Sequence, residues 1–149
     1  MSTYTEEVGE KLNELLEKTY DAEKGFKNAA DNIKNRALKN YFNSKASERN
    51  HFGHELKTEI RSFNQDIDKN GSLAGSAHRA WMDIKAMLSL DNEESMLEEA
   101  IRGEKTALKE YEDIISETTL PTSTKTILEF QKNKIKNGLY TIKTLEDIH

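Results

Sequence analysis

Apolar side chains recur at every third or fourth position along most of this chain, with polar and charged side chains between them. In the first long stretch, this spacing is followed by Val8, Leu12, Leu15, Thr19, Ala22, Phe26, Ala29 and Ile33. A second row beside this seam consists of Leu16, Glu23 and Ala30. A seam with one flanking row is typical of a helix that faces two neighbours in a bundle. The pattern therefore predicts an α-helix over about residues 3–33.

The same periodicity predicts four further helices, over about residues 37–64, 73–88, 92–117 and 123–147. A short break separates the first two helices, and a turn with the only proline, Pro121, separates the last two. Long helices joined by such short turns pack antiparallel. The shorter helix at 73–88 follows a polar linker that ends in the turn signal Asn70-Gly71. We expect this helix to lie in a connection that runs along the bundle.

The two halves of the chain resemble each other. Leu16-Glu17 is followed after five residues by Glu23-Lys24, and Leu97-Glu98 is followed at the same spacing by Glu104-Lys105. Such a repeat fits a pair of helical hairpins joined by a long crossover, which is the ferritin-like connectivity. We therefore expect one all-α domain over residues 1–149. Its predicted architecture is a ferritin-like antiparallel four-helix bundle, with a short extra helix in the crossover.

The composition excludes several classes of function. The 149 residues contain no cysteine, which excludes disulfides, thiolate catalysis, zinc–thiolate sites and iron–sulfur clusters. The net charge is −5, and no basic stripe interleaved with aromatics indicates nucleic acid as a partner. No apolar run approaches the about 20 residues of a membrane span, and no signal-peptide core is present. We expect a cytoplasmic protein with no membrane contact and no identifiable small-molecule substrate.

Three stretches carry a resemblance to a known family. They are Leu12–Ala30, the glycine-rich turn Gly71–Gly75 with His78-Arg79-Ala80-Trp81 after it, and Gly103–Tyr111. They resemble an uncharacterised bacterial family of ferritin-like four-helix-bundle proteins, a domain of unknown function that is distantly similar to rubrerythrin and bacterioferritin. The resemblance implies a ferritin-like fold and cytosolic residence. It implies no reaction.

Ferritin-like oxidases build a di-iron site from one Glu on each of two helices and Glu-x-x-His on each of the other two. Carboxylates bridge the two hard cations, and imidazoles occupy outer coordination positions. The corresponding candidates in this sequence are Glu23, Glu48, His51 and Glu104. At 100° per residue, Glu104 and Glu23 are expected to point inward. Iron or another divalent metal would be the cofactor of such a site.

The angles on the second and fourth helices indicate that this ligand set is incomplete. Arg49 falls near the centre of the apolar side of its helix, whereas Glu48 lies roughly 85° and His51 roughly 145° away from it. In the fourth helix, Lys132 stands where a histidine is required, and the inward polar residue is Gln131.

The same residues also fit an internal salt-bridge network without metal. Arg49 is expected to reach Glu23, with Glu104 as a further partner, and Glu48 and Gln131 complete the network. A buried arginine needs a partner, because an unpaired buried charge costs several kcal/mol. Two inward carboxylates without a cation would raise each other's pKa. We therefore expect a non-enzymatic bundle protein without cofactor, structural or stress-associated, that self-associates as a homo-oligomer. The alternative is a di-iron oxidase or metal-storage protein.

Three other groups of residues are candidates with plainer alternatives. His51 and His54, with Glu48 and Glu55 nearby, form either a zinc-binding surface patch or solvated surface. Asp66-x-Asp68-x-Asn70-Gly71 matches the start of an EF-hand loop, but Ala77 stands where the bidentate glutamate is needed. A polar turn is therefore the expected structure. His78, near Trp81, is expected to be a packing histidine.

Overall fold

A computed structural model describes residues 4–63, 93–117 and 119–148. All regular secondary structure in these ranges is helical: α1 (Tyr4–Asn32), α2 (Arg36–Ser62), α4 (Glu93–Glu117) and α5 (Thr122–Ile148). The predicted long helices are confirmed, with ends that differ by at most two residues. The predicted helix at 73–88, the EF-hand-like turn and His78 lie outside the described residues.

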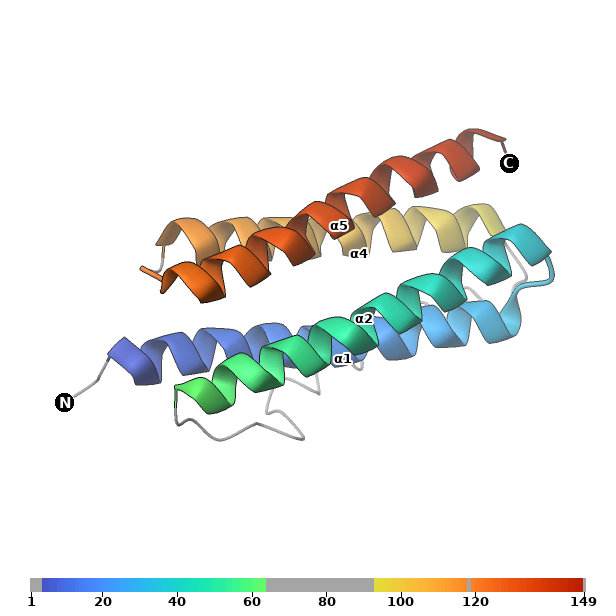
Figure 1. Cartoon of the computed structure of the whole chain (residues 1–149). Helices are drawn as coiled ribbons and strands as arrows, with labels where there is room; N and C mark the ends of the chain where they lie inside the picture. Colours follow the sequence, from blue (N-terminus) through green and yellow to red (C-terminus); the bar gives the residue numbers. More distant parts are fainter. Residues whose placement is uncertain (1–3, 64–92, 118, 149) are drawn as a thin grey trace.

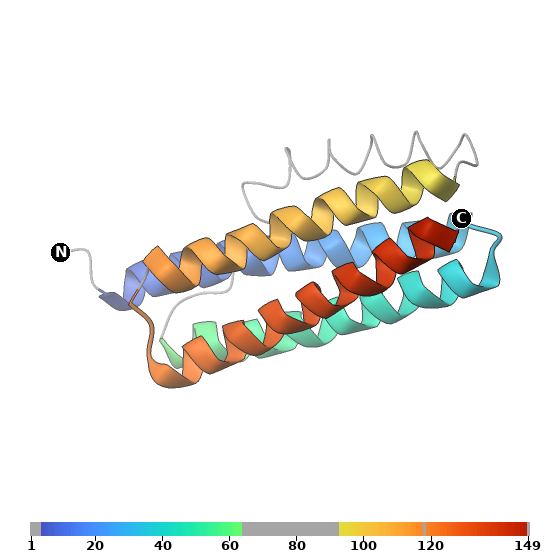
Figure 2. The same cartoon turned by 90° about the horizontal axis from the view of Figure 1, so that it is seen from above.

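The four helices form two antiparallel hairpins that stack on each other (Figure 1). One hairpin consists of α1 and α2, and the other of α4 and α5. In the stack, α1 lies beside α4 and α2 lies beside α5 (Figure 2). Each helix therefore has antiparallel neighbours, while α2 and α4 run in the same direction. This arrangement confirms the predicted all-α antiparallel four-helix bundle.

Local chemistry explains where the hairpins turn. Asn35 precedes α2 in an extended conformation, and its side-chain oxygen accepts a hydrogen bond from the Leu38 amide at 3.1 Å. Such an N-cap satisfies one of the amides that the first turn of a helix leaves without a partner. Pro121 precedes α5, and its carbonyl accepts from the Lys125 amide at 2.9 Å. A proline is tolerated here because its missing amide has no role at a helix start.

The apolar core is divided into two clusters along the bundle. The cluster near the α1–α2 turn contains Phe26, Ala29, Ala30, Ile33, Leu38, Phe42, Ala46, Met96, Leu97, Ile101, Leu139 and Ile142. The cluster near the α4–α5 turn contains Val8, Leu12, Leu15, Leu16, Phe52, Leu56, Ile60, Tyr111, Ile114, Leu128 and Ile135. Between them, at mid-bundle, α2 and α4 contribute buried charged side chains. None of the described helices combines the length and apolarity needed to cross a membrane.

Candidate functional site: a charged layer inside the bundle

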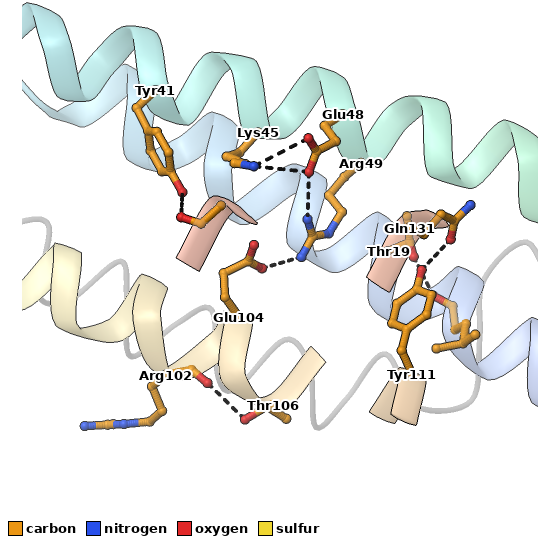
Figure 3. Close-up of polar contacts among 12 residues, drawn as sticks. Thr19, Tyr41, Lys45, Glu48, Arg49, Arg102, Glu104, Thr106, Tyr111 and Gln131 are labelled. Atoms are coloured by element: carbon orange, nitrogen blue, oxygen red, sulfur yellow. Dashed lines mark hydrogen bonds and ion pairs between the residues drawn. The ribbon is translucent and has the colours of Figure 1, made fainter. Parts of the chain in front are cut away.

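Arg49 lies at the middle of α2 and points into the bundle, where only 2% of it is exposed. Its Nη2 forms an ion pair with Oε1 of Glu104 on α4, and its Nη1 lies 3.6 Å from Oε1 of Glu48 (Figure 3). The rings of Phe26 and Phe52 flank the guanidinium, with centroids 5.5 and 5.6 Å from its central carbon. A planar, weakly hydrated guanidinium suits such a place better than an ammonium, because it can stack on aromatic rings while it pairs with carboxylates.

Lys45 supplies a second cation one helical turn before Arg49. Its Nζ donates to both carboxylate oxygens of Glu48, at 3.3 and 3.4 Å. The ammonium fits because α5 carries a glycine opposite it: a Cβ on Gly138 would lie 2.5 Å from the Lys45 Nζ. Next to Lys45, the Tyr41 hydroxyl donates a hydrogen bond to the Gly138 carbonyl at 3.0 Å. We call Lys45, Glu48, Arg49 and Glu104 the charged layer.

The charged layer is neutral in sum, but its hydrogen bonding is incomplete. Burial raises the pKa of the Glu104 carboxyl above its ordinary value, and the positive charges of Arg49 and Lys45 oppose this rise. Within the described part of the chain, neither Oε2 of Glu104 nor Nη1 of Arg49 has a hydrogen-bond partner. A buried polar atom without a partner costs about 1–3 kcal/mol. The layer is therefore held by charge pairing more than by complete hydrogen bonding.

A second polar group lies one to two turns further along the bundle and is uncharged at its centre. Tyr111 on α4 donates to Oε1 of Gln131 on α5 at 2.5 Å. The Gln131 amide nitrogen donates to Oε1 of Glu55 at 3.3 Å and to the Phe52 carbonyl at 3.5 Å, both on α2. Thr19 on α1 lies beside Tyr111, and its hydroxyl donates to the Leu15 carbonyl at 2.7 Å. Burial raises the pKa of the Tyr111 phenol. The hydrogen bonds of this tyrosine–glutamine group therefore join α2, α4 and α5.

The expected network of Glu23, Arg49, Glu104 and Gln131 is divided among three places in the structure. Arg49 and Glu104 meet in the charged layer, and Gln131 belongs to the tyrosine–glutamine group. Glu23 is only half buried, and it accepts a hydrogen bond from Asn50 at 3.2 Å. The expectation that Arg49 reaches Glu23 is thus corrected: Glu104 and Glu48 are its partners. Asn50 follows Arg49 and is rotated by 100° around α2, so it faces α1 while Arg49 faces the bundle axis.

The candidate metal ligands do not come together. Glu104 is buried and paired with Arg49, whereas His51 is exposed on the outside of α2, as is His54. Among residues 4–63, 93–117 and 119–148, no three His, Asp or Glu side chains are grouped to hold one ion. Two cationic side chains, Lys45 and Arg49, lie beside Glu48 and Glu104. A di-iron centre does not fit this donor set, because Glu48 and Glu104 are already paired with positive side chains and His51 points away from them.

Sequence reasoning missed Lys45, Tyr41 and Gly138. The signal for Lys45 was present, because a residue four positions before Arg49 lies on the same helix face. The role of Gly138 had no local signal. The Lys45 side chain of α2 occupies the space that a side chain at residue 138 would need, so the role of this glycine follows only from the packing of α5 on α2.

The fold and the layer define a class: an antiparallel four-helix bundle with a buried, charge-balanced ion-pair layer where its helices face each other. Within that class, the chain belongs to the family described as Domain of unknown function (DUF2383), whose model matches residues 7–117. The match includes all four residues of the charged layer and Tyr111, and it ends before α5 with Gln131 and Gly138. None of the curated proteins is detectably similar in sequence to this chain.

Proposed function

We propose that this chain is a non-enzymatic, ferritin-like bundle protein of the cytoplasm, in which two of its own cations take the place of a metal pair. Its proposed role is structural or stress-associated, and it self-associates through a helix face. The observation that carries the proposal is the ion pairing of Glu104 and Glu48 with Arg49 and Lys45 inside the bundle. The same direction of α2 and α4 supports the ferritin-like connectivity.

Electrostatics explains why such cations can replace a metal. Two carboxylates turned into an apolar bundle disfavour each other's charge and need positive charge beside them. A guanidinium bound to one carboxylate and an ammonium bound to the other satisfy this need within the chain itself. Once they are in place, a metal could bind only by displacing them, and the displaced charges would have to leave a largely buried position. The structural outcome is a bundle that needs no metal to be complete.

A second candidate function is metal binding by Glu23, Glu48, His51 and Glu104, as in a di-iron oxidase or metal-storage protein. One observation favours it: Oε2 of Glu104 is buried and lacks a hydrogen-bond partner among the described residues. Such an oxygen is a possible ligand for a hard cation. This function requires Arg49 and Lys45 to swing away and His51 to turn inward from its exposed position.

Metal analysis separates the two candidates. The protein is purified without chelators and without a histidine tag, and its metal content is measured by mass spectrometry. We expect less than a tenth of an equivalent of any transition metal per chain. Anaerobic Fe²⁺ titration followed by oxygen should give no stoichiometric binding and no oxo-bridge absorbance. One or two equivalents of tightly held metal would contradict the proposal and favour the second candidate.

The stress-associated role is tested separately in cells that carry the gene. We expect the protein to be several-fold more abundant after starvation or oxidative stress than during growth, as measured by quantitative immunoblot. Equal abundance in all conditions would leave the structural role and remove the stress-associated one.

A further inference from the structure

The outward side of α5 carries both exposed lysines and large exposed aromatics; of these, Lys134 and Phe130 contact each other, with the Lys134 Nζ 4.6 Å from the centre of the Phe130 ring. Phe130 is 52% exposed and Tyr140 is 65% exposed. Four lysines are exposed on the same helix: Lys125, Lys134, Lys136 and Lys143. Within the described residues, none of these four has a carboxylate within ion-pair distance. Aromatic residues are enriched at protein interfaces, and scattered lysines alone are not.

The neighbouring helix α4 carries the opposite charge. Its arginine and one of its two lysines are locally neutralised, because Arg102 pairs with Glu99 at 2.5 Å and Lys109 pairs with Asp113 at 3.2 Å. The other lysine, Lys105, is exposed, and no carboxylate among the described residues lies within ion-pair distance of it. Four other glutamates on α4 are exposed: Glu94, Glu98, Glu112 and Glu117. In the described part of the protein, no lysine or arginine lies within ion-pair distance of these four. The unpaired charge of α4 is therefore negative and that of α5 positive.

The two helices lie side by side and antiparallel, on the side of the bundle away from α1 and α2 (Figures 1 and 2). Gly138 faces α2, so Tyr140, which is rotated by 200° from it, faces away from α2. Lys136 and Lys143 lie four before and three after Tyr140, on the same face. Because the hairpin turns between 117 and 122, Lys143 lies level with the first turns of α4, where Glu94 and Glu98 are exposed.

We propose that the outward face of the α4–α5 hairpin binds the same face of a second copy of this chain, around a two-fold axis parallel to the helices. This axis places α5 of each copy on α4 of the other, so Lys143 of each copy meets Glu94 and Glu98 of the other. A surface that is complementary to itself in this way gives a closed dimer. Tyr140 is the central aromatic anchor of the contact. The inference specifies the surface of the proposed self-association and rests on that part of the proposed function.

The dimensions of this face suit a stable dimer. Helices of this length are about 40 Å long and about 10 Å wide, so two of them side by side offer roughly 800 Å² per copy. That area equals the about 800 Å² per partner of a standard specific interface. A polyanion such as nucleic acid is the less suitable occupant, because the whole protein carries a net charge of −5 and repels it at long range. A second copy brings its own unpaired glutamates.

Sedimentation velocity of the full chain tests the proposal with two charge-reversed variants. One variant is Lys136→Glu/Lys143→Glu on α5, and the other is Glu94→Lys/Glu98→Lys on α4. We expect the unaltered protein to dimerise in 50 mM NaCl and its Kd to rise at least tenfold in 500 mM NaCl, because salt screens exposed charges. Each variant alone should be monomeric. An equimolar mixture of the two should dimerise, because the reversed charge at residue 143 then meets the reversed charges at residues 94 and 98.

Matched controls separate this surface from a general effect of charge. Lys39→Glu/Arg61→Glu makes the same change in net charge on the exposed side of α2 and should leave the dimer intact. Tyr140→Ser should weaken the dimer at all salt concentrations. Circular dichroism checks that every variant remains helical.

Three results would overturn the inference. They are a strict monomer at 50 mM NaCl and millimolar concentration, a dimer that the α2 control disrupts as much as the α4 and α5 variants, and a monomer whose α5 lysines instead retain a polyanion such as heparin. A dimer formed through another face would leave the proposed self-association in place. None of these results bears on the charged layer, because Arg49 and Lys45 are unaltered in every variant.

Discussion

The charged layer and the tyrosine–glutamine group are both polar, buried and placed at mid-bundle, yet they are stabilised in different ways. Tyr111 and Gln131 are neutral, and their hydrogen bonds reach backbone and side-chain acceptors on other helices. Arg49 and Glu104 are paired by charge and each leaves one buried atom without a hydrogen bond. The neutral tyrosine–glutamine group should stabilise the fold modestly, and the loss of one partner leaves no unpaired buried charge. The charged layer should affect stability mainly because Arg49 or Glu104, without its partner, would be an unpaired buried charge.

The largest expected effect comes from removing one partner of the charged layer. Arg49→Leu leaves Glu104 buried with Lys45 as the remaining nearby cation among the described residues, and should lower the free energy of unfolding by about 3 kcal/mol or more. Urea denaturation followed by circular dichroism measures this loss. If a metal were the natural partner of Glu104, the same change would be mild.

The double change Arg49→Leu/Glu104→Leu sharpens this result. Replacing both partners of a buried ion pair by apolar residues of similar volume is often neutral or stabilising. We expect the double variant to regain most of the stability that the single variant loses. A double variant as unstable as Arg49→Leu would mean that packing around the arginine stem, and not its charge, is what the bundle requires.

The second largest effect is expected at high pH. Tyr41 lies next to the charged layer and Tyr111 belongs to the tyrosine–glutamine group, so each tyrosine reports on one of the two polar regions. Burial, assisted by nearby carboxylates, raises the pKa of Tyr41 and of Tyr111 above the ordinary value of 10.0. These carboxylates are Glu104 and Glu48 for Tyr41, and Glu104 and Glu55 for Tyr111. Above pH 10 the unfolded chain loses these protons while the folded protein keeps them. The stabilisation that comes from these two buried protons is therefore fully present below pH 10, and it is lost as the pH rises above 10. Between pH 10 and 11, each tyrosine should contribute a loss of about 1 kcal/mol.

Tyr41→Phe and Tyr111→Phe provide the check on this pH dependence. Each should remove its own share of the slope between pH 10 and 11, measured by urea denaturation at closely spaced pH values, and the double variant should remove both. An unchanged slope in the double variant would assign the alkaline loss to other groups, such as the lysines.

At neutral pH the tyrosine–glutamine group should give a smaller effect than the charged layer. Tyr111→Phe keeps the ring but leaves Oε1 of Gln131 buried without its donor, so stability should fall by about 1–2 kcal/mol. Thermal denaturation measures the change. A loss as large as that of Arg49→Leu would remove the contrast between the neutral and the charged group.

The smallest effects are expected at two glycines within helices. Gly103→Ala meets no atom within 4 Å and should stabilise by about 0.5–1 kcal/mol through helix propensity. Gly138→Ala has the same intrinsic advantage but would displace the Lys45 ammonium from Glu48. We expect it to be less stable than Gly103→Ala by about 1 kcal/mol or more. Equal stabilisation by both changes would mean that the Lys45 side chain moves aside at no cost.

The sequence was sufficient for elements whose causes are local. Helix ends were predicted to within two residues because apolar spacing, a proline and short polar breaks act within one or two turns. The inward position of Arg49 followed from its angle on α2. The N-cap at Asn35 lay within the predicted break but was not singled out, although Asn before a helix is a recognised signal.

What the sequence determined by itself was the four long helices and the face that each one buries, because hydrogen bonds within a helix and its 3.6-residue repeat are properties of neighbouring residues. What only the tertiary structure decided was which side chains meet. A helix advances 1.5 Å per residue, so a shift of about one turn between two helices changes the partner of an arginine from one carboxylate to another. Arg49 therefore meets Glu104 and not Glu23, and Lys45 finds its space at Gly138, because packing between distant helices sets their relative height and rotation.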